Sequence, residues 1–238
     1  MNMEQEAGTS AAGAADAADS GYYDDAYYES HYAHVFADAG YRQLLGEYWA
    51  HVLFDRHGVP REGEVLDYGC GPGHVSAALP RVTLFDHSPA CRRLLQRHGL
   101  RAIESDAAIE ADSFDAVLSS HSLEHSPNPA ADLERFARWV RPGGRLVLVL
   151  PREPLGRPVL VPDSNRHLQC WNFQAITNLL VHTGWKPLMQ GLVHGPWMLR
   201  RLNGMVGTRA AVRGASRLGA ARRWFESIAC IAEPVKRT

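Results

Sequence analysis

The sequence predicts an α/β fold in which helices cover both faces of a mostly parallel sheet. Short apolar runs alternate with helical patterns along the 238 residues, which is typical of parallel strands joined by right-handed crossovers. The run LVLVL at 146–150 is apolar throughout, as expected for a strand buried on both faces. A glycine-rich turn also follows an early strand pattern. The length suits one large domain with short appendages.

The elements follow one another in a regular order. We expect strands at 64–68, 82–86, 101–104, 114–119 and 144–150, with helices between them at about 74–79, 88–98 and 129–140. Apolar residues at helical spacing predict an earlier helix over about 38–57. After a loop that begins at Pro151, we expect a helix at 172–183 that ends at Gly184, a strand near 186–193 and a closing strand near 225–234.

The ends of the chain differ in composition from its centre. Residues 1–20 lack apolar periodicity, so we expect a disordered tail. Residues 21–60 begin with the aromatic cluster YYDDAYYESHY and are predicted to form a helical lid. Alternatively, those tyrosines pack the first helix onto the sheet. Residues 61–238 form the expected core, with an arginine-rich helical insert at about 197–223.

Composition narrows the possible locations and partners. No apolar run approaches the roughly 18 residues of a membrane span, and the four cysteines match no zinc or redox spacing. We therefore expect a cytoplasmic protein with free thiols. The net charge of −1 does not favour nucleic acid. Residues 191–225 hold seven arginines and no acid, which indicates either a solvated helical face or attraction to an anionic substrate or membrane surface.

The sharpest motif is the glycine loop VLDYGCGPG at 65–73. Three glycines at alternate positions allow the backbone to approach a ligand closely, because no Cβ intervenes. A dinucleotide fold uses the spacing G-x-G-x-x-G and binds a pyrophosphate there. Here the spacing is G-x-G-x-G, and Asp67 precedes it. An acid suits a ligand with an ammonium group and repels a pyrophosphate, which argues against a nicotinamide-dependent dehydrogenase.

Two further acids follow strands of the predicted sheet. Asp86 lies 17 residues beyond Gly69, the spacing expected for a carboxylate that binds ribose hydroxyls. Asp106 follows the third expected strand, where an adenine edge would lie. One such acid is more often a helix cap or turn residue. Three acids in register with the glycine loop favour a nucleoside-bearing ligand.

Together, VLDYGCGPG, LFD, SFDAVLSSHSLEH and RPGGRLVLVLP resemble the motifs of class I S-adenosylmethionine-dependent methyltransferases. The resemblance is dense over residues 62–151 and implies a Rossmann-like sheet of seven strands with the last one antiparallel. It also implies S-adenosylmethionine as the cofactor. The implied contacts are Gly69, Gly71 and Gly73 at the methionine part, Asp67 at its amino group, Asp86 at the ribose and Asp106 with Ala107 at the adenine, with His87, Ser119 and Tyr28 completing the set.

Two histidines are the candidate catalytic residues. Methyl transfer mainly requires alignment of the reactants, and a base is needed only where the acceptor must lose a proton. His121 follows the fourth expected strand, and His167 lies in the long loop after the fifth. Each could instead pack its loop, as we expect of His125. The sequence from His121 to His125 matches the H-x-x-E-H motif of zinc peptidases, but it follows a strand instead of lying on a long helix. We therefore predict no metal site.

The sequence thus predicts an enzyme that methylates oxygen or nitrogen of a small-molecule acceptor. The acceptor is expected in secondary-metabolite or glycan biosynthesis and could be anionic. We expect a monomer or homodimer with no transmembrane segment and no nucleic-acid partner. The alternative is a non-catalytic partner protein that binds S-adenosylmethionine.

Overall fold

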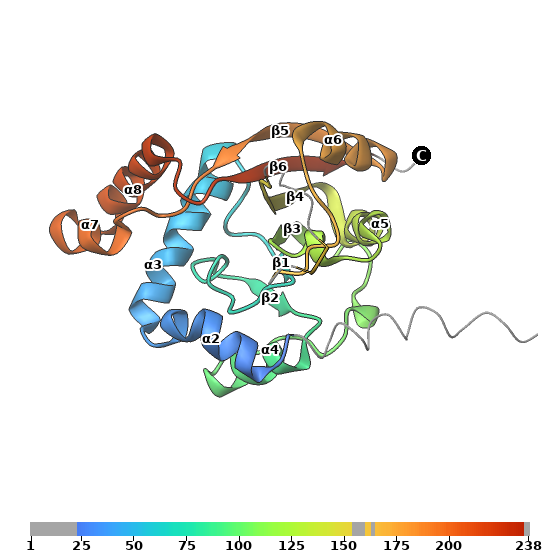
Figure 1. Ribbon diagram of the computed structural model, residues 1–238. Coiled ribbons are helices and arrows are strands. Elements are labelled where there is room, and N and C mark those ends of the chain that lie inside the picture. Colours follow the sequence, from blue (N-terminus) through green and yellow to red (C-terminus); the bar gives the residue numbers. More distant parts are fainter. Residues whose placement is uncertain (1–22, 154–159, 163–164, 236–238) are drawn as a thin grey trace, which may run out of the picture.

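The computed structural model describes residues 23–153, 160–162 and 165–235, and its centre is a six-stranded sheet (Figure 1). The strands are β1 (Val65–Tyr68), β2 (Val82–Phe85), β3 (Phe114–Ser120), β4 (Val140–Pro151), β5 (Trp185–Val193) and β6 (Ser227–Pro234), in the spatial order β2-β1-β3-β4-β6-β5. β6 runs antiparallel to both β4 and β5, whereas the other neighbours are parallel. The predicted parallel sheet with an antiparallel last strand is confirmed.

The sheet has six strands, so the expected count of seven is wrong. Residues 101–104, predicted to form the third strand, contribute only an isolated bridge between Ala102 and Leu84. In this bridge the N–H of Ile103 donates to the Leu84 carbonyl at 2.9 Å. The flanking Arg101 and Glu104 are exposed, so this segment has little apolar surface to bury against the edge of the sheet.

Helices cover both faces of the sheet in a three-layer arrangement (Figure 1). Alternate strand residues point to opposite faces, so Val147 and Val149 of β4 pack with one set of helices, and Leu146 and Leu148 with the other. The first set is α3 (Ala39–Trp49) and α8 (Thr208–Arg222); the second is α5 (Pro129–Trp139) and α6 (Phe173–His182). The long apolar run of β4 is therefore buried on both sides, as predicted.

Two further helices close the β2 edge of the fold. α2 (Asp25–Phe36) and α4 (Pro89–Arg97) share an apolar cluster with Leu84 of β2. The Ser88 side chain caps α4 by accepting the N–H of Cys91 at 3.3 Å, and Pro89 occupies the first turn. Both are favoured at helix starts because the first N–H groups lack partners inside the helix. This geometry fixes the start of α4 directly after the end of β2.

The helix predicted over 74–79 is not formed, and turns occupy that segment. α3 packs directly on it: a Cβ built on Gly46 would lie 2.5 Å from the Ala78 backbone nitrogen. The buried Ser76 hydroxyl also donates to Asp67 at 2.5 Å. This tertiary packing outweighs the local helical pattern. The connection between the adjacent strands β1 and β2 therefore consists of turns and contains no helix.

The remaining predictions match the structure to different extents. The expected helix over 38–57 is α3 followed by the π-helical turn Ala50–Phe54 and the short 3₁₀ turn Asp55–His57. α6 ends before Gly184, whose φ of 82° suits glycine. The arginine-rich insert forms α7 (Leu199–Val206) and α8. The predicted tail at 1–20 and Tyr22 lie outside the described residues, and the lid function of 21–60 stays a prediction.

None of the helices within the described ranges is long and apolar enough to cross a bilayer.

The contact between α3 and the 77–78 segment predicts an unusual response to Gly46→Ala. In most helix interiors this change stabilises, because glycine is roughly 0.5–1 kcal/mol worse than alanine. Here the added methyl forces the two backbones apart, and we expect a loss of about 1–3 kcal/mol. Gly204→Ala in α7 is the matched control, since no atom lies within 4 Å of its Cβ position. Urea unfolding should show that Gly46→Ala lowers the free energy of unfolding and that Gly204→Ala raises it. Stabilisation by both variants would contradict the close packing of α3 on the 77–78 segment.

Candidate active site

A large cavity opens at the carboxyl ends of β1, β2, β3 and β4. Its volume is about 1350 Å³, whereas a pocket for one small ligand is typically about 300–1,000 Å³. It lies at the point where the chain turns from β1 to β2 on one side and to β3 on the other, the usual ligand-binding position in such sheets. The cavity therefore has room for two ligands side by side.

The glycine loop after β1 forms one wall of this cavity. Gly69 has a φ of 72°, and a Cβ there would overlap the side chain of Ser122. Gly71 has a φ of 50°, and its Cβ position has no atom within 4 Å among the described residues. Glycine is thus required at Gly69 by close packing and is favoured at both positions by the backbone. The loop presents bare backbone to the cavity.

Asp86, directly after β2, organises this wall. Its two oxygens accept the backbone N–H groups of Gly71 and Ser88, each at 2.9 Å. The Tyr28 hydroxyl of α2 lies 3.5 Å from the same carboxyl, and burial raises the pKa of Tyr28, so it remains a donor. A carboxylate has about four acceptor positions. The two backbone bonds and the longer Tyr28 contact therefore leave acceptor capacity for a ligand hydroxyl.

Asp67 lies at the buried end of β1 and accepts the Ser76 hydroxyl at 2.5 Å. Burial raises its pKa to about 7, against the opposing effect of the Ser76 hydrogen bond, and the nearby Asp86 raises it further. Within the described part of the chain, no arginine, lysine or histidine side chain forms an ion pair with this carboxyl. A ligand with a positive charge would therefore be stabilised here while holding Asp67 ionised.

Asp106 is held by protein groups at the far end of the wall. Its carboxyl accepts the Tyr68 hydroxyl at 3.1 Å and lies 4.0 Å from the Arg135 guanidinium. Arg135 also donates to the Tyr68 hydroxyl at 3.0 Å. Asp106 faces the cavity, while Ala107 beside it is exposed. This end of the wall is a preassembled polar network.

The structure gathers most of the predicted site residues in the cavity. Those that line it are Tyr28, Asp67, Gly69, Gly71, Asp86, His87, Asp106, His121 and His167. The others lie outside the lining. Gly73 packs against the Leu84 side chain, Ala107 faces solvent and Ser119 is buried within β3.

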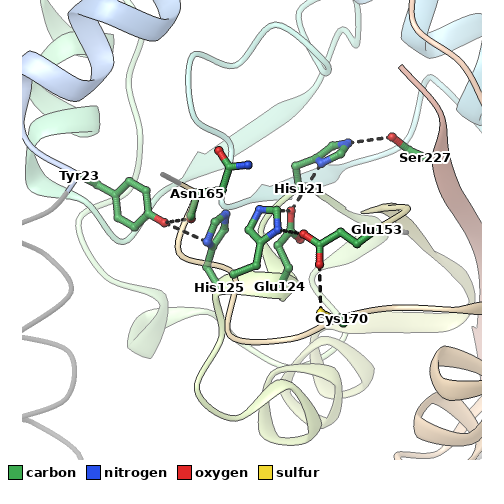
Figure 2. A network of polar contacts seen from close by, with 9 residues as sticks. Tyr23, His121, Glu124, His125, Glu153, Asn165, Cys170 and Ser227 are labelled. Atoms are coloured by element: carbon green, nitrogen blue, oxygen red, sulfur yellow. Dashed lines mark hydrogen bonds and ion pairs between the residues drawn. The ribbon is translucent and has the colours of Figure 1, made fainter. Parts of the chain in front are cut away.

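A polar cluster forms a second wall of the cavity, beyond the end of β3 (Figure 2). His121 adopts a φ of 50°, which is unusual for a residue other than glycine. Its Nδ1 lies 3.5 Å from Glu124 Oε1, and its Nε2 lies 3.1 Å from the Ser227 hydroxyl of β6. Glu124 belongs to the short turn η4 (Leu123–His125) and is fully buried.

His167 reaches the same cluster from the loop that precedes α6. Its Nδ1 contacts the Glu153 carboxylate, and its Nε2 lies 4.0 Å from Glu124 Oε1. The Glu124 carbonyl accepts the N–H groups of Leu168 and Gln169 at 2.9 and 3.0 Å. These backbone bonds fasten the loop to η4. The two predicted catalytic histidines therefore share one partner, Glu124.

Several lining residues were not identified from the sequence. His125 was expected to pack its loop, yet it lines the cavity with its Nδ1 2.9 Å from the Tyr23 hydroxyl. Glu153, which contacts His167 but is not part of the cavity lining, was missed as well. It follows β4, so an acid beyond a strand end was the available signal. His74 is buried beside the glycine loop, and burial lowers its pKa to about 4. It is therefore neutral near pH 7.

Comparisons with known proteins match this geometry. A family model described as a methyltransferase domain matches residues 33–190, more than half of the chain. Ubiquinone biosynthesis O-methyltransferase of Xanthomonas oryzae pv. oryzae (strain PXO99A) is 38% identical over 105 residues, which cover 38% of this chain and 44% of that protein. The enzyme of that name from Xylella fastidiosa (strain 9a5c) is 40% identical over 103 residues, 37% of this chain and 42% of that protein. The matches span less than half the length of these relatives.

A solved structure shows the same fold along almost the whole chain. It is the 1,6-didemethyltoxoflavin-N1-methyltransferase of Burkholderia thailandensis, with bound 1,6-didemethyltoxoflavin and S-adenosylhomocysteine. The TM-score is 0.54 at 19% identity, and the alignment covers 98% of this chain and 94% of that one.

The raised pKa of Asp67 predicts a pH-dependent stability. The folded-state pKa of about 7 exceeds the unfolded value of about 3.9. The contribution of Asp67 to the free energy of unfolding is therefore fully present below pH 3.9 and is lost as the pH rises through 7. Asp67→Asn cannot ionise, so the ligand-free variant should gain stability relative to wild type between pH 5 and 8, by on the order of 1–3 kcal/mol. Glu134→Gln, at an exposed position, is the control. The free energy of unfolding is measured with urea at each pH. If the difference between Asp67→Asn and wild type did not change with pH, the raised pKa of the buried Asp67 carboxyl would be contradicted.

Proposed function

The chain belongs to the class I S-adenosylmethionine-dependent methyltransferases, and on that premise we propose that it methylates an oxygen atom of a small-molecule acceptor. The observation that carries this proposal is the cavity at the strand switch point, where the glycine loop and Asp86 form one wall and the histidine cluster forms the other. The curated relatives named as O-methyltransferases support oxygen over nitrogen.

The first wall fits the cofactor group by group. Asp67 is buried and its pKa is raised, so the positive charge of the cofactor's ammonium group would stabilise its ionised form. Asp86 has two oxygens fixed by backbone N–H groups, with acceptor capacity left for ribose hydroxyls. Gly71 leaves the space that a Cβ would otherwise fill. Asp106 would contact the adenine edge from its network with Tyr68.

The second wall fits an acceptor that must lose a proton. When bound, the cofactor would supply a methyl group on a sulfonium: an acceptor oxygen would form the new bond as the carbon–sulfur bond breaks, with that electron pair left on sulfur. We assign proton removal from the acceptor hydroxyl to the His121 ring, which lines the cavity and is about half exposed. Glu124 beside it would stabilise the imidazolium that results.

The arginine-rich helices are not placed to recognise an anionic acceptor in this cavity. Among the described residues that line it, none comes from the seven arginines of 191–225. Arg200 pairs with Asp38 and lies 4.9 Å above the Tyr41 ring. An anionic acceptor, and a role in secondary-metabolite or glycan biosynthesis, stay predictions. A measurement of turnover is needed to distinguish the proposed enzyme from a non-catalytic protein that only binds S-adenosylmethionine.

Calorimetric titration tests the cofactor wall. S-adenosylmethionine should bind the wild type, and Asp86→Ala should weaken binding by about 10- to 100-fold, the effect of losing hydrogen bonds to a charged group. Glu134→Gln, on the exposed face of α5, should leave the affinity unchanged. A nicotinamide dinucleotide should not bind. Equal affinity of wild type and Asp86→Ala would contradict the assignment of this wall.

Turnover tests the proposed reaction itself. With a set of phenolic and catecholic acceptors, we expect S-adenosylhomocysteine and an O-methylated product in equal amounts. His121→Ala should lower kcat by about 10²–10⁴-fold while cofactor affinity stays within twofold, and the loss should shrink as the acceptor becomes more acidic. Cofactor binding without any product, across acceptors of oxygen and nitrogen type, would favour the non-catalytic alternative.

A further inference from the structure

We propose that Glu124, His125 and His167 bind a divalent transition-metal ion of the zinc type, which faces the acceptor side of the cavity. The three residues come from η4 and from the loop before α6. Their candidate ligand atoms all lie within 4.8 Å of one another.

Glu124 provides the first argument. Its side chain is fully buried, and within the described residues neither carboxyl oxygen has a hydrogen-bond partner. The imidazole nitrogens His121 Nδ1 and His167 Nε2 lie 3.5 and 4.0 Å from its Oε1, distances that are too long for good hydrogen bonds. A buried carboxylate without donors costs several kcal/mol unless a cation lies beside it. The surrounding imidazoles make a metal ion the fitting cation.

The distances suit a small ion after modest adjustment. A zinc ion holds nitrogen and oxygen ligands at about 2.0–2.2 Å, which places tetrahedral ligand pairs about 3.4 Å apart. The present separations of up to 4.8 Å are closed by small rotations of the three side chains. The rings of His125 and His167 already lie 4.9 Å apart between centroids and meet edge to face.

The histidines are anchored in the way that metal-binding histidines are. His167 Nδ1 contacts the Glu153 carboxylate, which directs its Nε2 toward Glu124. His125 Nδ1 lies 2.9 Å from the Tyr23 hydroxyl. A carboxylate or hydroxyl partner on one ring nitrogen fixes the ring orientation and raises the basicity of the other nitrogen. Figure 2 shows Tyr23 and Glu153 approaching the cluster from opposite sides.

The backbone holds the site together before any ion binds. The Glu124 carbonyl accepts the N–H groups of Leu168 and Gln169, so the residue after His167 is bonded directly to the residue before His125. Two segments that are about 40 residues apart in the sequence are thereby fixed in register. Little ordering free energy is then needed when the ion binds, which favours tight binding.

The donor set indicates which ion and which role. Two imidazoles and one carboxylate suit Zn²⁺, whereas Mg²⁺ prefers a shell of oxygens. Three protein ligands would leave a fourth position, and all three residues line the cavity. Resting on the proposed function, that position takes the acceptor hydroxyl and lowers its pKa; the O–H bond breaks, the proton passes to His121, and the oxygen keeps the electron pair that attacks the methyl group. The binding of zinc itself does not depend on methyl transfer.

The test uses the full chain without a histidine tag. Protein is stripped with a chelator, dialysed and titrated with zinc chloride by calorimetry, and bound zinc is counted by elemental mass spectrometry. The variants are Glu124→Gln and His167→Ala. One control is His182→Ala, at an exposed position at the end of α6. The other is Cys170→Ser, because the Cys170 thiol lies 3.0 Å from Glu153. Circular dichroism and S-adenosylmethionine titration establish that each variant is folded.

We expect one zinc ion per wild-type chain and per control, with at least 100-fold weaker binding in both site variants. Zinc should raise the Tm of the wild type and leave that of Glu124→Gln unchanged. Without metal, Glu124→Gln should be at least as stable as wild type, because it removes a buried carboxylate. Cobalt-substituted wild type should show d–d absorption without a thiolate charge-transfer band.

No zinc binding by folded wild type, or equal binding by Glu124→Gln and His167→Ala, overturns the site. Loss of zinc in Cys170→Ser alone also overturns it, because the thiol would then be the ligand. Zinc binding by a chain that transfers no methyl group would support the site and contradict the proposed function instead.

Discussion

The carboxylate of Asp86 is the contact on which the cofactor side of the structure depends. It joins the glycine loop after β1 to the first turn of α4 through the N–H groups of Gly71 and Ser88. Tyr28 brings α2 to the same point. Three segments that the sheet alone would leave apart therefore meet around one acceptor. A bound ribose would complete this arrangement, so binding and local order are coupled.

Two buried carboxyl groups, Asp67 and Glu124, oppose stability in the ligand-free chain. Asp67 lies in apolar surroundings that raise its pKa to about 7, and the oxygens of Glu124 lack hydrogen bonds among the described residues. Natural sequences keep such groups mainly where function requires them. Both residues line one cavity. A cationic cofactor would complete Asp67, and the proposed metal ion would complete Glu124.

Local patterns in the sequence were sufficient for the strands of the sheet, apart from the one expected at 101–104, and for the glycine loop and Asp86 of the first wall. The glycine loop and Asp86 follow consecutive strands, and the ends of parallel strands meet at one edge of a sheet. The absent helix at 74–79 could not be predicted, because α3 packs on that segment from a distant part of the chain. The contact between His167 and Glu153 was equally hidden, since it joins two positions of a long loop whose path no periodicity specifies. The second wall is thus a product of tertiary structure.

A crystal structure of the chain with S-adenosylhomocysteine tests the central claim most directly. The account predicts the ribose hydroxyls within about 3 Å of Asp86 and the ammonium group beside Asp67. It also predicts that the sulfur faces the cluster of His121 and Glu124. Ligand density elsewhere on the chain, or a ligand in the cavity that contacts neither Asp67 nor Asp86, would contradict it.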